Sequence, residues 1–170
     1  TMPTTGADNG MSLVELMYED FDNDELWDKL LDQLTDEDYV NLTLLGAHTI
    51  SHATSVNAPG TRVQDGPAGI RDVEGSVAYP GETLMACTFN ADLVKRIGEA
   101  FGMEMQYLGF GALYGPGANI HRNAFGGRNF EYFSEDGVLS GIMLDAELTG
   151  FADMGIITYT KHFVLNDQER

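Results

Sequence analysis

The stretch Leu108-Gly-Phe-Gly-Ala-Leu-Tyr-Gly-Pro-Gly-Ala-Asn-Ile-His121 predicts a short strand that runs into a glycine-rich loop. Helices are predicted on both sides of this strand. Before it, Asn90 or Asp92 can cap a helix with one apolar face, and after it a helix is expected over residues 137–154. The β-branched run at residues 156–160 is the next predicted strand. Strands that alternate with helices indicate βα units, and so an α/β fold with mainly parallel strands.

Two further strands are predicted towards the N-terminus. Residues 61–65, Thr-Arg-Val-Gln-Asp, form an extended run that Gly66-Pro67 brings to an end. Residues 83–89 are apolar and are also predicted as a strand, with Cys87 buried in it. About four strands fit in 170 residues, whereas a closed (β/α)8 barrel needs about 250. The sequence therefore predicts either half of a barrel or a small open sheet.

The N-terminal third is predicted to be helical after a polar lead-in. Leucines at helical spacing predict a helix over residues 24–34, and Thr35-Asp36-Glu37-Asp38 provides the cap of a second helix that runs to about Leu45 and is stopped by Gly46. Residues 1–23 are acidic and lack periodic apolar positions, so we expect a linker or a disordered lead-in there. The expected domain is residues 24–170.

Charge and composition exclude several classes of function. Acidic residues outnumber basic ones by 27 to 9, and the formal net charge is −18. Nucleic acid and anionic membrane surfaces would repel such a chain. The single cysteine permits no internal disulfide, and no apolar run approaches the ~18 residues of a membrane span. We expect a cytoplasmic protein, unless an export signal lies outside this sequence.

No cofactor or metal ion is expected from the motifs. The acidic run Asp20-x-Asp22-x-Asp24 lacks the glycine and the twelfth-position glutamate of a calcium loop. His48 and His52 have the spacing of metal ligands, but no third ligand accompanies them. The sequence around Gly109-x-Gly111 lacks the third glycine of a dinucleotide fingerprint.

Three polar stretches come where predicted strands end, at residues 65–71, 117–136 and 161–169. The carboxyl ends of strands are where α/β barrels build their sites. A pyranose ring needs hydrogen-bond acceptors and donors that converge on neighbouring hydroxyl groups. Aspartate accepts, arginine and lysine donate, and histidine does either. The residues that supply this mixture are Asp65, Arg128, Lys161 and His162.

The same stretches resemble glycoside hydrolase family 3 over about residues 26–170. That family has a D-G-P-x-G motif, an N-I-H-R-x-P-x-G-G-R-N-F-E-Y-x-S-E-D-P motif and a K-H-F-x-x-N-x-Q-E motif, in this order. The resemblance implies the first half of a TIM-type (β/α)8 barrel of the β-glucosidase branch. It also implies that Asp65, Arg128, Lys161 and His162 line the subsite for the non-reducing sugar. This sequence departs from the family at Ala124, Phe125 and Gly137, none of which is a proposed ligand.

The resemblance further implies that the catalytic groups are not in this sequence. A retaining glycosidase needs two carboxylates about 5 Å apart, and the family's S-D-W-like nucleophile motif is not found here. We therefore expect a fragment of a retaining β-glucosidase that acts on terminal β-D-glucosyl residues and is inactive alone. Its expected partners are a β-glucoside or oligosaccharide substrate, the rest of the barrel and a sandwich domain. The alternative is a non-catalytic or vestigial half-barrel that binds sugar.

Overall fold

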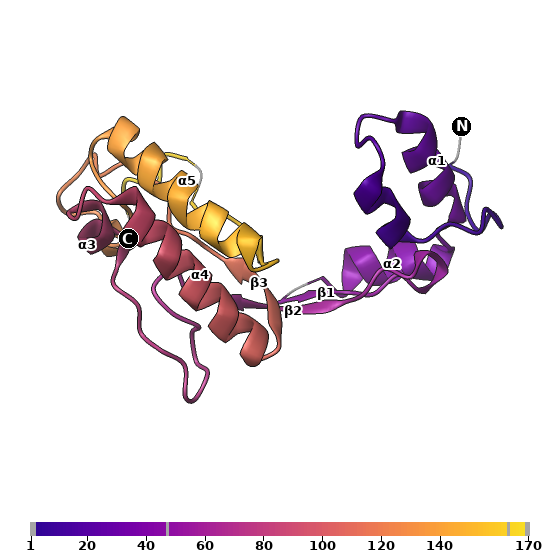
Figure 1. Cartoon of the computed structure of the whole chain (residues 1–170), viewed down its shortest axis with the longest axis horizontal. Coiled ribbons are helices and arrows are strands. Elements are labelled where there is room, and N and C mark those ends of the chain that lie inside the picture. Colours follow the sequence, from indigo (N-terminus) through magenta and orange to yellow (C-terminus); the bar gives the residue numbers. More distant parts are fainter. Residues whose placement is uncertain (1–2, 47, 163, 169–170) are drawn as a thin grey trace. The chain divides into compact units, whose positions relative to one another are not determined.

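The computed structural model describes residues 3–46, 48–162 and 164–168 (Figure 1). The chain divides into two compact units, Thr1–Arg62 and Val63–Arg170. No helix among the described residues is long and apolar enough to cross a membrane. The elements of the first unit, in which η marks a 3-10 helix, are η1 (Leu13–Tyr18), α1 (Asp24–Gln33), α2 (Asp36–Leu44), β1 (Thr49–Ile50) and η2 (Thr54–Val56).

Side-chain caps start both α-helices of the first unit. The Asn23 side chain accepts the amide of Leu26 at the start of α1. At the start of α2, the Thr35 hydroxyl accepts the Asp38 amide at 3.1 Å, and the Asp38 carboxylate accepts the Thr35 amide at 3.0 Å. Such a reciprocal capping box satisfies two backbone donors that the helix cannot satisfy itself. The two predicted helices are confirmed, with ends within one residue of those expected.

The N-terminal residues take part in the core of the first unit. Leu16 of η1 is buried and packs in one cluster with Leu30, Leu34, Ala53 and Val56. The Gln33 side chain accepts the Met11 amide and donates to the Met11 carbonyl, both at 2.9 Å. Residues 11–18 are therefore packed against the core of the first unit. The sequence did not reveal this because η1 offers one buried leucine and no periodic apolar face. A domain boundary at residue 23 stays a prediction.

The second unit alternates strands and helices, and the α/β prediction is confirmed. Strand β2 (Thr61–Asp65) begins in the first unit, where Thr61 and Arg62 pair antiparallel with β1, and its last three residues belong to the second unit; the strand order is β1-β2-β3-β4. The parallel pairing of β3 with β4 joins Ala112 to Ile157. Strand β1 was not predicted. The remaining elements are α3 (Glu82–Ala86), α4 (Ala91–Tyr107), β3 (Phe110–Tyr114), η3 (Asn129–Glu131), α5 (Gly137–Asp153) and β4 (Ile157–Thr158).

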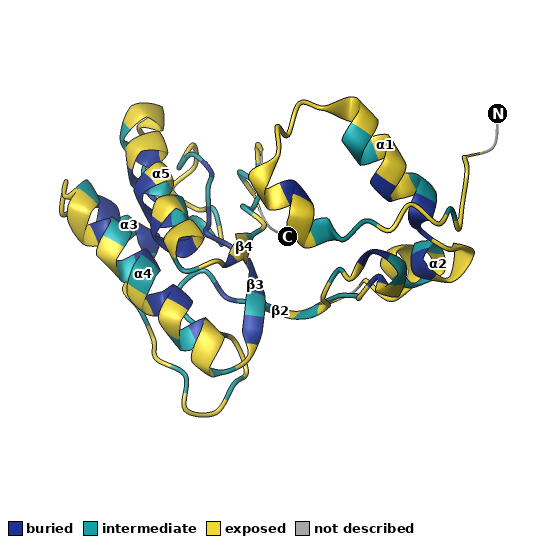
Figure 2. Cartoon of the chain, turned by 45° about the vertical axis from the view of Figure 1, so that its right-hand side comes forward, coloured by how far each residue is buried: buried dark blue, intermediate teal, exposed yellow. Residues whose placement is uncertain are grey.

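Helices α4 and α5 pack closely because glycines lie at their contact. A Cβ atom on Gly98 of α4 would lie 2.6 Å from the carbonyl oxygen of Glu147 on α5. A Cβ atom on Gly150 of α5 would lie 2.3 Å from the carbonyl oxygen of Lys95 on α4. Each helix is buried along one side and exposed along the other (Figure 2). The buried sides contribute to two apolar clusters, one around Ile70, Phe101, Met105, Phe110, Leu113, Phe151 and Ile156, the other around Met85, Ala86, Val94, Phe133, Met143 and Ala146.

The predicted strand at residues 83–89 is wrong, because this segment contains the short helix α3. Leucine, methionine and alanine are good helix formers, and a short apolar run does not distinguish a strand from a buried helix. Met85 and Ala86 face the core, whereas Cys87, at the C-terminal cap, is exposed. The expectation of a buried thiol is therefore also wrong. Helix α4 follows, and of the two predicted caps it is Asn90 that starts it, with its side chain accepting the Leu93 amide.

Candidate functional site

Asp65 is the last residue of β2 and is held by a tight loop. The Arg71 amide donates to the Asp65 carbonyl oxygen at 2.8 Å, so the chain returns to the strand end within six residues. Gly66 has φ +133°, and a Cβ atom there would collide with the carbonyl oxygen of Gly69. A side chain at position 66 would therefore open the loop. The tight turn of Gly66-Pro-Ala-Gly69 thus brings Asp65 and Arg71 close to each other.

Lys161 is positioned by the chain that continues β3. The Tyr159 amide donates to the Leu113 carbonyl at 2.8 Å, and the Lys161 amide donates to the Pro116 carbonyl at 3.1 Å. A parallel bridge between Gly117 and Lys161 extends this pairing beyond β4. The peptide bond between Lys161 and His162 is cis. Lys161 therefore lies past the carboxyl end of β4, as Asp65 lies at the carboxyl end of β2.

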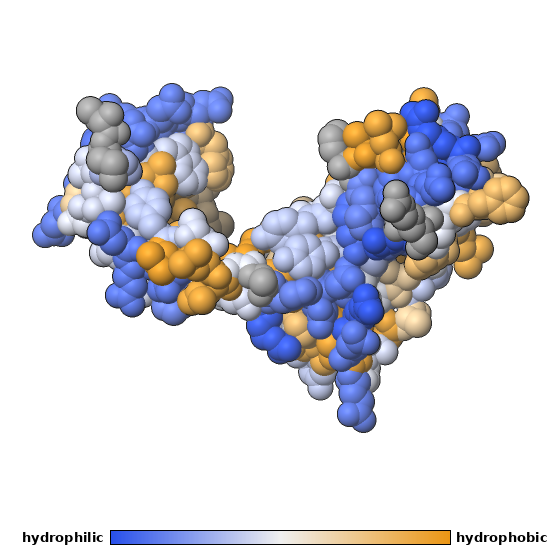
Figure 3. Space-filling view, turned by 180° about the vertical axis from the view of Figure 1, so that it is seen from behind, coloured by the Kyte–Doolittle hydropathy of each residue, from blue (hydrophilic) through white to orange (hydrophobic). Residues whose placement is uncertain are grey.

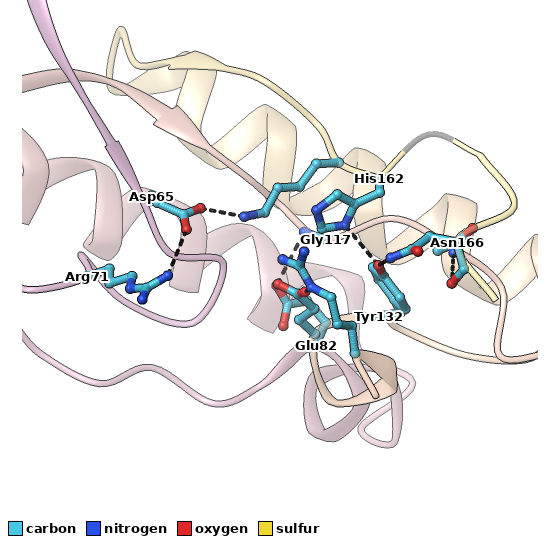
Figure 4. A network of polar contacts seen from close by, with 11 residues as sticks. Asp65, Arg71, Glu82, Gly117, Tyr132, His162 and Asn166 are labelled. Atoms are coloured by element: carbon cyan, nitrogen blue, oxygen red, sulfur yellow. Dashed lines mark hydrogen bonds and ion pairs between the residues drawn. The ribbon is translucent and has the colours of Figure 1, made fainter. Parts of the chain in front are cut away.

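The Asp65 carboxylate lies between two cationic side chains (Figure 4). Lys161 Nζ contacts Asp65 Oδ1, and Arg71 Nη1 lies 3.6 Å from Asp65 Oδ2. The side chains of Asp65 and Lys161 are 26% and 17% exposed, so the pair is reachable from solvent without being fully hydrated. Burial alone would raise the pKa of Asp65, but the hydrogen bond and charge of Lys161 outweigh burial and lower it. Asp65 is thus a charged acceptor at neutral pH.

Arg128 is held by an acidic side chain from its own segment. Its Nε atom contacts Oε1 of Glu131 in η3, and the Glu131 side chain is 3% exposed while that of Arg128 is 33% exposed. The buried carboxylate therefore holds a guanidinium that remains partly exposed. Glu131 was quoted within a sequence motif but was not predicted as a contact of Arg128.

His162 belongs to a chain of hydrogen bonds. The fully buried Tyr132 places its hydroxyl 2.8 Å from His162 Nδ1 and accepts Asn166 Nδ2 at 2.7 Å. The Asn166 carbonyl in turn accepts Asn119 Nδ2 at 2.7 Å. Figure 4 shows Tyr132 between His162 and Asn166. These contacts fix the orientation of the imidazole ring, and sequence reasoning had assigned no role to Tyr132.

Two buried acids near the site were missed by the sequence analysis. Glu82, the first residue of α3, is 0% exposed, and its Oε1 lies 3.4 Å from the Gly117 amide. Burial, with a smaller contribution from the charge of Glu131, raises its pKa to about 8, although backbone hydrogen bonds and the charge of Lys161 act to lower it. Glu147 of α5 is 1% exposed, and burial together with the charge of Glu82 raises its pKa well above the usual value. Both residues stand outside every motif, so no local signal marked them.

All four residues predicted for the site lie in the second unit. Asp65 contacts Lys161, and His162 follows in the chain. Glu82 connects this group to Arg128, since Glu82 interacts electrostatically with both Lys161 and the partner of Arg128, Glu131. A charged acceptor beside several donors suits a polyhydroxyl ligand. Among the described residues, no group of three or more His, Cys, Asp or Glu side chains is placed to hold a metal ion.

Comparison with known sequences places these residues in a family. The family model described as Glycosyl hydrolase family 3 N terminal domain matches residues 34–168. A beta-glucosidase from Ruminococcus albus is 43% identical over 120 residues, which are 69% of this chain and 13% of the relative. Beta-glucosidase A from Butyrivibrio fibrisolvens is 38% identical over 133 residues, 76% of this chain and 16% of the relative. The chain thus spans between 13% and 16% of the length of these two curated relatives.

Solved structures match the fold. Beta-glucosidase 3B from Thermotoga neapolitana, determined in complex with glucose, matches with a TM-score of 0.71 at 35% identity. The match covers 83% of this chain and 23% of the Thermotoga chain. The GH3 beta-glucosidase from Bifidobacterium adolescentis has a TM-score of 0.74 at 33% identity, with coverages of 81% and 21%. The α/β fold matches the N-terminal part of a TIM-type barrel domain, as predicted.

Proposed function

The chain belongs to glycoside hydrolase family 3, and we propose that it forms the glucose-binding part of a retaining β-glucosidase. The observation that carries the proposal is the contact of Asp65, at the carboxyl end of β2, with Lys161, which follows the carboxyl end of β4. A structural relative with 35% identity was solved in complex with glucose. The substrate would be a β-glucoside or an oligosaccharide with a terminal non-reducing β-D-glucosyl residue.

In this proposal the ionised Asp65 accepts hydrogen bonds from sugar hydroxyl groups. A carboxylate has about four lone-pair directions, and Lys161 and Arg71 occupy a part of them. Lys161 and Arg128 donate to the hydroxyl oxygens, and His162, held by Tyr132, contacts a hydroxyl near the reacting carbon. Charge-assisted hydrogen bonds of this kind are shorter and stronger than neutral ones. The site selects a ligand with adjacent hydroxyl groups over an apolar one.

Both catalytic carboxylates are proposed to come from chain outside residues 1–170. Retaining hydrolysis needs a nucleophile and an acid/base about 5 Å apart, both open to the sugar. The acids next to the site do not suit this role, because Glu82, Glu131 and Glu147 are buried and Asp65 is engaged by cations. The chain alone would then bind glucose without hydrolysing glucosides.

Exposed apolar residues support contact with further chain, namely the rest of the barrel and a sandwich domain. On α5 and near β4, Val138, Ile142, Ile157 and Tyr159 are between 41% and 73% exposed. Figure 3 shows hydrophobic residues at the surface of both units. Apolar side chains that gather on a surface are typical of contact areas.

The binding proposal is tested by titrating the chain with D-glucose and following amide chemical shifts. Replacing Asp65 by Asn or Lys161 by Met removes a charged partner, which is worth about 1.5–3 kcal/mol, so Kd should rise at least about tenfold. Asp145→Asn, an equal change on the exposed side of α5, is the matched control and should leave Kd unchanged. Equal affinity of all three variants and the native chain would overturn the assignment.

The catalytic part is tested with an aryl β-glucoside. We expect no turnover by the isolated chain, whatever its affinity for glucose. Turnover that a substitution within residues 1–170 abolishes would show that the catalytic acids have been misplaced. The gene itself separates the hydrolase from a non-catalytic sugar-binding protein: a reading frame that continues into a Ser-Asp-Trp motif supports the first, and a stop codon after Arg170 supports the second.

A further inference from the structure

Among the glutamates that the structure describes in the second unit, three are buried, namely Glu82, Glu131 and Glu147, and they differ in their partners. Glu131 contacts the cation of Arg128. Glu82 Oε1 lies 3.4 Å from the Gly117 amide, from which it accepts a hydrogen bond, and among the described residues the buried Oε2 of Glu82 has no partner. Glu147 likewise has a buried Oε2 without a partner in the described part of the chain. Leaving carboxylate oxygens buried and unpaired is costly, so Glu82 and Glu147 call for an explanation.

Glu82 is tied to Lys161 through the backbone. The amide that Glu82 accepts belongs to Gly117, and Gly117 forms a parallel bridge with Lys161. A Cβ atom on Gly117 would collide with the carbonyl oxygen of Glu131 and lie 3.4 Å from Glu82 Oε1. The bare glycine therefore allows the carboxyl group to reach the segment that holds Lys161.

Glu82 is also tied to Lys161 through charge. The ammonium group of Lys161 stabilises the ionised form of Glu82, while Glu131 of η3 opposes it and Glu147 of α5 interacts with Glu82. Arg128 is directed to Glu131, and Asp65 to Lys161. Lys161 is thus the cation that an ionised Glu82 would attract, and Asp65 is the acid with which it would compete.

We infer that Glu82 is a positioning residue for Lys161, which makes sugar binding dependent on pH. With its proton, Glu82 is a neutral acceptor that fixes the Gly117–Lys161 backbone and leaves the ammonium group with Asp65. Without the proton, its charge draws Lys161 away from Asp65 and from the sugar hydroxyl groups. This inference rests on the proposed glucose site and adds its control by a buried proton. The raised pKa of Glu82, about 8, places the change in mildly alkaline solution.

The experiment measures glucose Kd from about pH 7 to about pH 9 for the native chain, Glu82→Gln and Glu147→Gln. Native Kd should rise about tenfold over this range, because a charge-assisted hydrogen bond from Lys161 is lost. Glu82→Gln keeps an acceptor for Gly117 but cannot ionise, so its Kd should stay constant. Glu147→Gln removes an equally buried acid that does not contact Gly117, and should keep the rise. A pH dependence that persists in Glu82→Gln would overturn the inference.

A second measurement uses the native chain without sugar, so it does not depend on whether a variant folds. In the free native chain, the Gly117 amide and the Lys161 side-chain signals should titrate together with a midpoint near pH 8. Constant signals over this range would overturn the inference. If these signals titrate but the native chain binds no glucose at pH 7, the proposed function fails while the coupling of Glu82 to Lys161 stands. If glucose binds with unchanging Kd, the function stands and the control by Glu82 fails.

Discussion

Two buried acids, Asp38 at the start of α2 and Glu82 at the start of α3, have pKa values shifted in opposite directions. They are 4% and 0% exposed, and each lies in the first turn of its helix. The carboxylate of Asp38 accepts the Thr35 amide at 3.0 Å, the Thr35 hydroxyl at 2.7 Å and the Thr54 amide at 2.9 Å. Glu82 accepts the Gly117 amide at 3.4 Å.

The difference lies in the donors that surround each acid. Burial acts against ionisation of both, but the hydrogen bonds to Asp38 outweigh it and lower its pKa to about 2, whereas burial of Glu82 raises its pKa to about 8. Helix N-termini favour negative charge in both places. The comparison teaches that directed donors decide the charge of a buried acid here, more than depth or helix position. At neutral pH Asp38 is therefore an anion and Glu82 keeps its proton.

The largest expected effect concerns Glu82. The unfolded chain loses this proton near pH 4.5, while the folded chain keeps it up to about pH 8, so native stability falls as pH rises through this window. Glutamine does not ionise, so the stability of Glu82→Gln should not fall in this way. Between pH 5 and pH 8 its free energy of unfolding should rise by about 3 kcal/mol relative to that of the native chain. The free energy of unfolding is measured by urea denaturation, with the near-UV circular dichroism of the tyrosines as the signal. The exposed Glu135→Gln is the control, and an equal pH dependence in all three proteins would refute the comparison.

The next effect is the loss of the donor network around Asp38. Asp38→Ala should destabilise the first unit by about 2 kcal/mol at neutral pH, because it removes the capping box and leaves the Thr54 amide without its acceptor. Since the pKa of Asp38 is lowered to about 2 from 3.8, this stability is present above pH 3.8 and lost as pH falls towards 2. The fluorescence of Trp27 in α1, the sole tryptophan, follows unfolding. A loss below about 0.5 kcal/mol would contradict the role of the donors.

A smaller effect is expected at the hydroxyl of Thr35. Thr35→Ala removes the cap of α2 and one donor to Asp38, at a cost of about 1 kcal/mol. Thr35→Ser keeps the hydroxyl and should restore most of this loss. The same denaturation experiment compares the two variants, and a serine variant as unstable as the alanine variant would show that the methyl group, and not the hydroxyl, matters.

The smallest effect belongs to the helix dipole alone. Asp36 is exposed in the first turn of α2, and Asp36→Asn should cost about 0.3 kcal/mol at low salt. High salt should remove this difference, since exposed charges are screened. Denaturation of both proteins at low and high salt measures it. A cost as large as that of Asp38→Ala would mean that position in the helix, and not hydrogen bonding, governs these acids.

These two acids also mark what the sequence could predict. The cap of α2 is local, because Thr35 and Asp38 lie three residues apart, and its prediction is confirmed. The environment of Glu82 is not local, since its hydrogen bond joins residues 35 positions apart. Helix α3 was mistaken for a strand because its apolar side chains fit either structure and its burial depends on α4 and α5.

The site was predictable where a family motif carried it. Asp65 and Lys161 are 96 residues apart and in contact, yet both were selected from the sequence. Their supports were not, because Arg71, Glu131 and Tyr132 acquire their roles through contacts made in the folded chain. The motifs selected side chains that lie close together in the fold, whereas packing determines what holds those side chains.

The exposed thiol of Cys87 is a natural labelling site for measuring a distance within this molecule. It is the sole cysteine and lies at the end of α3 in the second unit, while the sole tryptophan, Trp27, lies in the first. A dye attached to Cys87 would accept excitation energy from one donor, without any engineered site. Energy transfer from Trp27 to that dye would then measure the separation of the two units in solution and show whether glucose changes it.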